Sequence, residues 1–256
     1  MEEKTKIELL APVGNMEALR AAVQNGADAV YMGGKSFNAR QYAQNFDNEE
    51  LREAVAYAHL YGVKVYVTVN TLLDNSEIPE LIDYLYTLQA ARVDALIVQD
   101  LGVIRLIRSL LPEMELHAST QMNVHNPAGI RFLEEIGLKR VVLAREVSLE
   151  NIALLRQNST MPLEVFVHGA LCVCYSGQCL MSSMIGGRSG NRGRCAQPCR
   201  LNYTLVNSRG EELQTGHLLS PRDLKMIEHL PLLLEAGISS LKVEGRMKRP
   251  EYVATV

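Results

Sequence analysis

All five cysteines of this 256-residue chain fall in one short segment, from Cys172 to Cys199. Their spacing is Cys172-x6-Cys179-x15-Cys195-x3-Cys199, with Cys174 inside the first interval. Four thiolates can hold a tetrahedral zinc ion or an iron–sulfur cluster. Zinc ribbons usually pair their cysteines at about two to four residues, which the second pair matches and the first does not. The wider, irregular spacing favours an iron–sulfur cluster, and zinc or unligated, redox-active cysteines are the alternatives.

The cysteine segment also lacks acidic residues. From Val165 to Gly210 the chain has no Asp or Glu, although it carries 29 acidic residues in total. The same stretch has no lysine and contains Arg188, Arg192, Arg194, Arg200 and Arg209. Arginine presents a rigid fork of donors that suits phosphate and carboxylate groups. We predict that Arg188, Arg192 and Arg194 bind an anionic substrate, either an RNA backbone or a dicarboxylate, and a solvated basic loop is the alternative.

The overall composition is that of an ordinary globular protein. The net charge is -3 and 47% of the residues are hydrophobic, so bulk charge alone does not make the chain a polyanion binder. The start MEEKTKIELLAPVG lacks the apolar core of a secretory signal, and no run approaches the roughly 18 apolar residues of a membrane span. We therefore expect a cytoplasmic protein with no membrane partner. Structural disulfides are rare in that compartment, so the clustered thiols indicate a metal site.

Short apolar runs alternate with helical patterns along most of the chain. Helix starts are marked by Asn15, by Asp47 with Glu50 in a capping-box spacing, and by Asn126. The runs are apolar throughout, as expected of parallel strands buried on both faces. The expected strands span residues 7–12, 28–34, 64–70, 95–100, 115–121, 140–146, 163–169 and 240–245. Eight strand–helix units predict an α/β fold of the (β/α)8 TIM-like barrel type, and a doubly wound open sheet is the alternative.

A long interval separates the seventh and eighth expected strands, and it contains all the cysteines. We assign residues 170–218 to a cysteine-rich insertion, in which two strand-like runs around residues 208–210 predict a β-hairpin. A helical stretch is expected over residues 220–237, interrupted at Pro231. Loops that follow barrel strands form the catalytic face, so the insertion is expected to cover the mouth of the barrel. The final helix begins at Pro250 and is truncated, which suggests a fragment of a longer protein.

Polar residues at the carboxyl ends of the expected strands are the catalytic candidates. They are Asn70, Gln99, Asp100, Gln121, Arg145, Glu146, His168, Glu244 and Arg246. We expect Arg145 and Arg246 to bind an anionic donor, and His168 and Glu146 to transfer protons. Glu244 belongs to the catalytic set, and Gln121 and Asn70 are expected to bind substrate. His117 lies early in its strand and is expected lower in the barrel; a buried structural role is the alternative for each residue.

The run EVFVHGALCVCYSGQCLMSS resembles the peptidase U32 family, also called the collagenase-like proteases. The stretches ELLAPVGN, GADAVYMGG, HASTQMNVHN and KVEGRMKRPEYVATV are similar to the same family, so the resemblance covers essentially the whole chain. It implies a U32-type barrel over residues 1–256 that forms the N-terminal part of a longer protein.

The resemblance also implies an activity. Similar members of the family carry out oxygen-independent hydroxylation of a tRNA uridine, a 23S rRNA cytidine or the ubiquinone ring. The resemblance implies a [4Fe–4S] cluster held by Cys172, Cys179, Cys195 and Cys199. It also implies prephenate as hydroxyl donor for the RNA enzymes. Cys174 falls outside that ligand pattern and is expected to be a packing residue. RNA is therefore the expected substrate, and Zn²⁺ is the alternative metal.

The family name implies a different activity, the cleavage of peptide bonds. The chain has no HExxH motif, no GxSxG elbow and no paired acids in a protease frame. A pair formed by Cys172 and His168 is the one arrangement that suits nucleophilic catalysis, and a cysteine that ligates iron cannot serve as nucleophile. A collagenase-like peptidase is therefore the alternative function.

Overall fold

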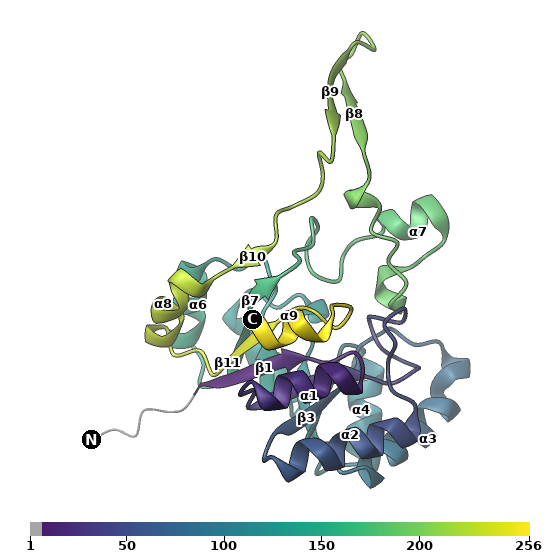
Figure 1. Ribbon diagram of the computed structural model, residues 1–256, viewed down its shortest axis with the longest axis vertical. Coiled ribbons are helices and arrows are strands. Elements are labelled where there is room, and N and C mark those ends of the chain that lie inside the picture. The colour runs from purple at the N-terminus through teal and green to yellow at the C-terminus, as the bar shows by residue number, and fades with distance from the viewer. Residues whose placement is uncertain (1–6) are drawn as a thin grey trace.

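Eight parallel strands close into a barrel in this computed structural model, which describes residues 7–256 (Figure 1). The ring is complete because β7 pairs with β6 on one side and with β11 on the other, and β11 pairs with β1. The strands are β1 (Glu8–Pro12), β2 (Ala29–Gly33), β3 (Lys64–Val69), β4 (Ala95–Val98), β5 (Glu115–Ala118), β6 (Arg140–Val142), β7 (Leu163–Gly169) and β11 (Ser240–Val243). The closure confirms the predicted barrel and excludes the open sheet. Residues 1–6, the first part of the start MEEKTKIELLAPVG, lie outside the described residues.

Helices follow the strands and cover the outside of the barrel. Three predicted caps are confirmed: Asn15 accepts a hydrogen bond from Ala18 N at 2.8 Å, Asp47 forms a capping box, and Asn126 caps its helix. The helices are α1 (Met16–Gln24), α2 (Asn48–Leu60), α3 (Ile78–Ala90), α4 (Leu101–Leu110), α5 (Pro127–Glu135), α6 (Leu149–Gln157), α8 (Leu230–Glu235) and α9 (Pro250–Thr255). Among the described residues, none of the helices is both long and apolar enough to cross a membrane.

The hydrophobic core lies between the strands and the helices. Strand residues such as Val65 and Leu96 are fully buried against helix residues such as Leu19, Leu51 and Leu85. A second, smaller apolar group lies inside the barrel and consists of Leu10, Ala29, Tyr31, Tyr66, Ala95 and Ile97. Both faces of each strand are therefore buried, which explains why the strands read as continuous apolar runs.

The lower half of the barrel interior also holds paired charges. Arg140 contacts both Glu8 and Glu164, at 3.1 Å from the latter, and Lys242 Nζ lies 2.7 Å from Glu164 Oε1. Burial alone would raise the pKa of Glu164, but the charges of Lys242 and Arg140 outweigh it and lower the pKa to about 2. His117 is fully buried at the same level, as predicted, and burial lowers its pKa. The interior is thus held together by compensated charge as well as by packing.

One expected helix is wrong in its first part. Residues 220–226 are not helical; they include strand β10 (Leu224–Lys225), which pairs antiparallel with Gly169 and His168 of β7. β7 runs well beyond its shorter neighbour β6, and β10 takes the edge that β6 leaves open. Four expected strands were also at least two residues too long, because β4, β5, β6 and β11 end at Val98, Ala118, Val142 and Val243.

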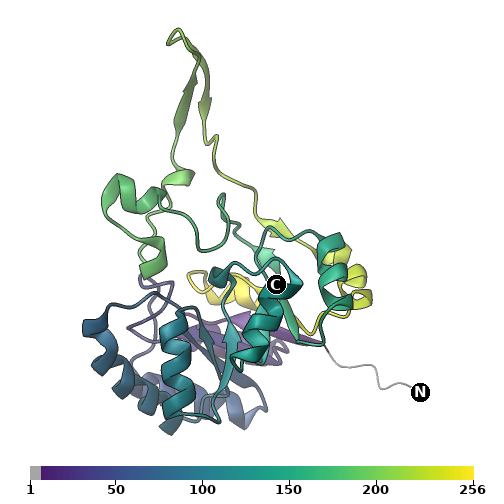
Figure 2. The same ribbon diagram turned by 180° about the vertical axis from the view of Figure 1, so that it is seen from behind.

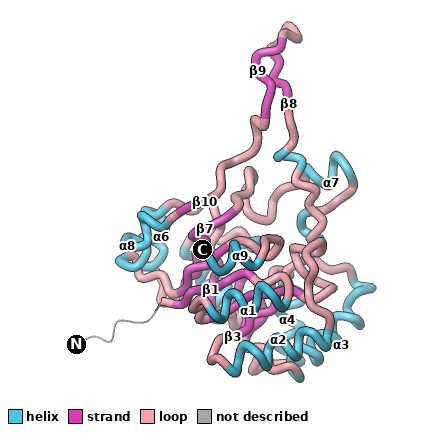
Figure 3. Tube along the Cα trace, viewed as in Figure 1, coloured by secondary structure: helices cyan, strands magenta, loops and turns pink. Residues whose placement is uncertain are grey.

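The cysteine-rich insertion leaves the barrel after β7 and returns at β10. It contains the short helix α7 (Met181–Gly186) and the hairpin of β8 (Tyr203–Val206) and β9 (Glu212–Gly216), which confirms the predicted hairpin. The hairpin projects away from the barrel in both views (Figures 1 and 2). The rest of the insertion is largely loop (Figure 3), so its position depends on the contacts that it makes with the barrel.

The paired interior charges predict a specific stability effect. Glu164→Leu leaves Lys242 without its carboxylate, and we expect a loss of about 3–5 kcal/mol in the free energy of unfolding, measured by urea denaturation at pH 7. Because the pKa of Glu164 is lowered from 4.5 to about 2, its contribution is complete above pH 4.5 and disappears as the pH falls through about 2. The double variant Glu164→Leu with Lys242→Met is the control, and it should recover much of the loss. An equal loss in the single and double variants would contradict this account.

Candidate functional site

The first half of the insertion is anchored on the loops that follow β5 and β6. Ser176 donates from its backbone N and from its hydroxyl to the two carboxylate oxygens of Glu146, each at 2.9 Å. Gly177 has φ +74, and a Cβ there would lie 2.2 Å from the carbonyl oxygen of Gln121. Only glycine allows so close an approach of the two backbones. The loop from Cys172 to Cys179 is therefore fixed to this side of the mouth.

The second half is anchored on the loops that follow β2 and β3. Arg192 forms a two-pronged ion pair with Glu77, one contact being 2.7 Å, and also donates to the carbonyl of Leu72. A Cβ on Gly193 would lie 2.2 Å from the carbonyl oxygen of Asn38. The segment that leads to Cys195 is thus held on a different side of the mouth from the first half.

The insertion therefore brings the thiols together from two directions, and none of the five forms a disulfide. Burial raises the pKa of Cys199, and the neighbouring Cys172, Cys195 and Cys179 thiols raise it further against the charge of Arg200. Burial likewise raises the pKa of Cys174, which lies beside Cys179 and Cys172 and is hydrogen-bonded to Cys179. All five sulfurs lie in one region, with Cys174 among them rather than apart.

The donor set suits a thiolate-bound metal centre in number and type. Within residues 7–256, however, no three His, Cys, Asp or Glu side chains meet in an arrangement that could hold a metal ion. Neighbouring thiols help to raise the pKa of Cys174 and of Cys199 after burial, and a bound cation would remove that repulsion. The ligand assignment and the bystander role of Cys174 stay predictions.

Below the insertion, one carboxylate lies among three guanidinium groups. Glu244, at the end of β11, lies 2.6 Å from Arg145 and 3.1 Å from Arg40. Burial would raise the pKa of Glu244, but Arg40, Arg145 and Arg246 outweigh it and lower the pKa to about 2. Burial lowers the pKa of Arg246 to about 10, so this group is still a cation at neutral pH. We call Arg40, Arg145 and Arg246 the mouth arginines.

The mouth arginines line a cavity of about 40 Å³. Its walls also include Tyr31, Asn70, Gln121, Phe166, Lys242 and Glu244. In the described part of the chain, the buried atoms Arg145 Nε, Arg246 Nε and Gln121 Oε1 have no hydrogen-bond partner. Buried polar atoms without partners are rare, and these residues line a space that fits roughly three waters, or one carboxylate group. The cavity is thus a small site with positive charge in excess.

Five of the residues selected from the sequence meet at this cavity. They are Arg145, Arg246, Glu244, Gln121 and Asn70. Asn70 accepts a hydrogen bond from Ala39 N at 3.0 Å and donates to Ser119 at 3.2 Å, so it also fixes the loop that carries Arg40. Arg40 itself was missed, because it lies in a loop well beyond the end of β2 and no strand pattern points to it.

The two residues expected to transfer protons lie elsewhere. The ring of His168 packs against Tyr252, with 5.8 Å between centroids, and His168 does not line the cavity. Glu146 anchors Ser176 and lies 3.0 Å from His125 Nε2. Asp100 caps α4. Their placement favours structural roles, and their catalytic assignment stays a prediction.

The three arginines expected to bind substrate separate into two kinds. Arg192 is paired with Glu77. Arg188 and Arg194 are exposed, close to these contacts between the second half of the insertion and the barrel. Arg194 donates to Gln41 Oε1 at 2.7 Å, and Arg188 lies over the ring of Tyr42. Arg192 therefore fixes the insertion, while the other two remain available to a ligand.

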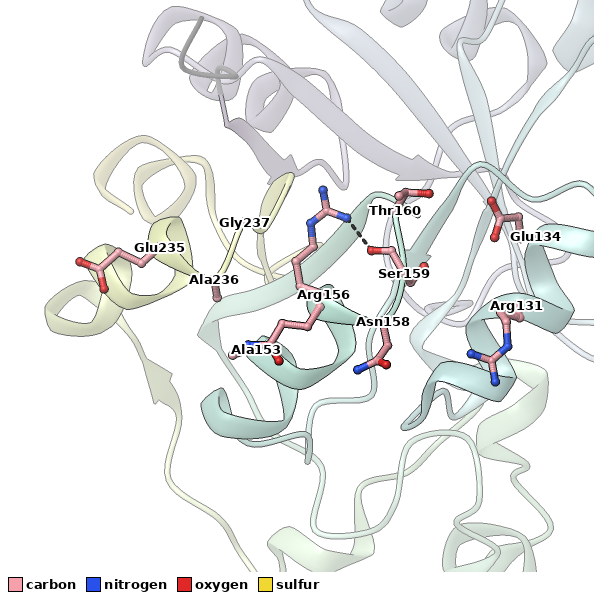
Figure 4. A pocket seen from close by; sticks show the side chains of 11 residues that line it. Arg131, Glu134, Ala153, Arg156, Asn158, Ser159, Thr160, Glu235, Ala236 and Gly237 are labelled. Atoms are coloured by element: carbon pink, nitrogen blue, oxygen red, sulfur yellow. Dashed lines mark hydrogen bonds between the residues drawn. The ribbon is translucent and has the colours of Figure 1, made fainter. Parts of the chain in front are cut away.

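A larger open cavity of about 780 Å³ lies on the opposite face of the barrel. Its walls come from α5, from the turn after α6 and from the end of α8, and Arg156 donates there to the carbonyl of Ser159 at 2.6 Å (Figure 4). These segments precede β6, β7 and β11, so they lie at the amino ends of the strands. Barrel enzymes build their chemistry at the other end, and the cysteines lie there too.

Comparison with known proteins decides the family. A family model described as "Peptidase family U32" matches residues 14–256, which is nearly the whole chain. The chain belongs to peptidase family U32. Curated U32 relatives include the "tRNA hydroxylation protein P1" of Bacillus subtilis (strain 168), which is 45% identical over 98% of this chain and 61% of its own length. The "23S rRNA 5-hydroxycytidine C2501 synthase" of Escherichia coli (strain K12) is 43% identical over 98% of this chain and 38% of its own length.

A further U32 relative has a peptidase name. The "Collagenase" of Porphyromonas gingivalis (strain ATCC BAA-308 / W83) is 37% identical over 97% of this chain and 63% of its own length. The chain thus spans less than two thirds of these relatives. A solved U32 peptidase superposes with a TM-score of 0.62 at 12% identity, covering 95% of this chain and 94% of that one. At such identity the likeness bears on the fold alone, and it agrees with the U32 barrel.

The close approach of Gly177 to Gln121 predicts how a substitution at Gly177 would release the loop from Cys172 to Cys179. Gly177→Ala should push the loop off Gln121 and raise the labelling rate of the Cys179 thiol with a maleimide by about tenfold, because the loop gains access to solvent. Gly187→Ala is the matched control, since Gly187 also has a positive φ, of +66, but open space around its Cβ position. Equal labelling rates in the two variants would show that the contact with Gln121 does not hold the loop.

Proposed function

We propose that this U32 barrel is the catalytic domain of an iron–sulfur-dependent, oxygen-independent hydroxylase that modifies RNA. The observation that carries the proposal is the gathering of five thiols in an insertion whose Gly193 and Arg194 are hydrogen-bonded to Gln41, the neighbour of the mouth arginine Arg40. A cluster bound by Cys172, Cys179, Cys195 and Cys199 supplies electron-transfer chemistry that protein side chains lack. Zn²⁺ is the alternative metal, and it supplies Lewis-acid chemistry instead.

The hydroxyl donor is a small dicarboxylate such as prephenate, which places one carboxylate in the cavity and extends toward the insertion, because a space of about 40 Å³ holds only one such group. The mouth arginines exceed Glu244 in charge, and guanidinium forks match the geometry of carboxylates. The buried N–H groups of Arg145 and Arg246 that lack partners among the described residues would gain them from a bound carboxylate. Glu244 holds the side chains of Arg40 and Arg145 in place before the donor arrives. Gln121 and Asn70 lie on the same wall and orient the donor by hydrogen bonds.

RNA is the substrate that the names of the relatives support. Two of them, each above 40% identity, are named for hydroxylation of tRNA or of an rRNA cytidine. The cavity, at about 40 Å³, is too small for a nucleobase, so the base would approach between the insertion and the barrel rather than enter the cavity. The exposed Arg188 and Arg194 supply positive charge on that path. Free thiols and an RNA substrate are both consistent with a cytoplasmic enzyme.

Peptide cleavage is the second candidate, and the name of the Porphyromonas relative favours it. A cysteine or serine peptidase needs a histidine hydrogen-bonded to its nucleophile. In the described part of the chain, the hydrogen bonds of the histidine side chains go to Asp94, Glu115, Asn123 and Arg200 and not to a cysteine or serine. His168 packs on Tyr252 instead of pairing with Cys172. The hydroxylase is therefore the better-supported function.

The ligand assignment predicts the result of anaerobic reconstitution with iron and sulfide. Wild-type protein should take up four irons and four sulfides per chain, and alanine at any one of the four predicted ligands should abolish the cluster's visible absorbance. Cys174→Ala is the matched control and should bind as much iron as wild type. Loss of iron in Cys174→Ala with retention in Cys199→Ala would mean that the ligand set is wrong.

The donor assignment predicts the origin of the added oxygen. Reconstituted protein incubated without air with RNA and ¹⁸O-labelled prephenate should give a hydroxylated nucleoside that carries the label, detected by mass spectrometry. Arg246→Lys should raise the donor concentration needed for half-maximal rate, because it removes the guanidinium fork but keeps the charge. Label from water, or cleavage of a collagen peptide that survives removal of iron, would contradict the proposal.

A further inference from the structure

A tyrosine and two arginines form an exposed surface beside Arg192 and Gly193, where the second half of the insertion contacts the barrel. Tyr42 lies in the loop between β2 and α2, and 57% of its surface is exposed. The guanidinium of Arg188 lies over its ring, 4.7 Å from the centroid. Arg188 Nε donates to the carbonyl of Arg194 at 3.0 Å, and Arg194 Nε donates to Gln41 Oε1 at 2.7 Å. The insertion and the barrel loop therefore build this surface together.

The positive charges of Arg188 and Arg194 are available to bind an anionic ligand. Their neighbour Arg192 is neutralised by Glu77. Within residues 7–256, no ion pair joins Arg188 or Arg194 to an acidic side chain. Each uses its Nε for the contacts above, so the terminal nitrogens of both guanidinium groups remain at the exposed surface. The acid-free sequence of the insertion explains why no carboxylate competes for them.

The surface adjoins the mouth of the barrel. Gln41 N donates to the carbonyl of Gly193 at 3.2 Å, which joins the Tyr42 loop to the cysteine segment. Arg40, two residues before Tyr42, lines the mouth cavity, and Gln41 is hydrogen-bonded to Gly193 and Arg194, the two residues before Cys195. A chain bound at Tyr42 would thus pass directly beside the predicted cluster ligand and the donor cavity.

We propose that Tyr42 stacks a nucleobase of single-stranded RNA while Arg188 and Arg194 bind the adjoining phosphates. The inference rests on the proposed function, because it concerns how the RNA substrate is held. Chemistry on a base requires that the base leave its helix, and unpaired bases are bound by stacking on aromatic rings and guanidinium planes. Arg188 braces one face of the Tyr42 ring, and the exposed part of the ring receives the base. The stacked base is a neighbour of the one that is modified.

The test separates stacking from charge. Fluorescence anisotropy would measure the affinity of the full chain for an unstructured oligoribonucleotide and for the same backbone with abasic sites. Tyr42→Ala should weaken binding of the base-bearing strand about tenfold, the size of stacking on a single base, and leave the abasic strand unaffected. Arg194→Gln should weaken both strands and reduce the slope of log affinity against log salt by about 0.7, the value for one phosphate on a single strand.

Two controls keep the test specific. Tyr42→Phe keeps the ring and should bind like wild type. Tyr61→Ala removes an equally exposed tyrosine, 58% accessible, at the end of α2 on the far face of the barrel, and should have no effect. If Tyr42→Ala binds both strands as wild type does, the stacking site is overturned while the RNA-modifying function stands. If wild-type protein binds neither strand, the inference and the RNA function fall together.

Discussion

Charge inside the barrel lies where water is scarce, so each charged group must be matched by an opposite one or turned toward a ligand. In the lower half the match is complete, because Glu8 and Glu164 face Arg140 and Lys242. At the mouth it is not, because Glu244 is the only carboxylate that residues 7–256 place among the three guanidinium groups. The barrel therefore carries its excess of positive charge at the end where the insertion stands. An anionic ligand would complete there the compensation that the lower half achieves with side chains alone.

The insertion determines where the thiols can lie. Its two halves are fixed to different sides of the mouth by an ion pair, by hydrogen bonds from Ser176 and by two glycines packed against barrel carbonyls. A centre that draws sulfur ligands from both halves would tie the sides together above the mouth arginines. Cluster and donor cavity would then share one space, which is the arrangement that transfer of a hydroxyl group between donor and RNA requires.

Sequence reasoning predicted the barrel because its strands are buried on both faces and its helices carry strong caps, both of which are local signals. It failed over residues 220–226, where the long β7 offers an edge to β10, since that edge exists only once the strands are aligned. The same limit applies to the site. The roles of Glu146 and Arg192 as anchors depend on Ser176 and Glu77, which are distant in the chain. Arg40 was missed because it reaches Glu244 from a loop.

The most direct test of the central claim, that a cluster lies above the mouth arginines, is electron paramagnetic resonance of the reduced, anaerobically reconstituted protein. Spectra would be recorded with and without a ¹³C-carboxylate-labelled dicarboxylate. The account predicts a cluster signal in wild-type protein and a magnetic coupling to the labelled carboxylate that is lost in Arg246→Lys. A protein that gives no cluster signal after reconstitution, or a cluster signal with no coupling to the bound label, would contradict it.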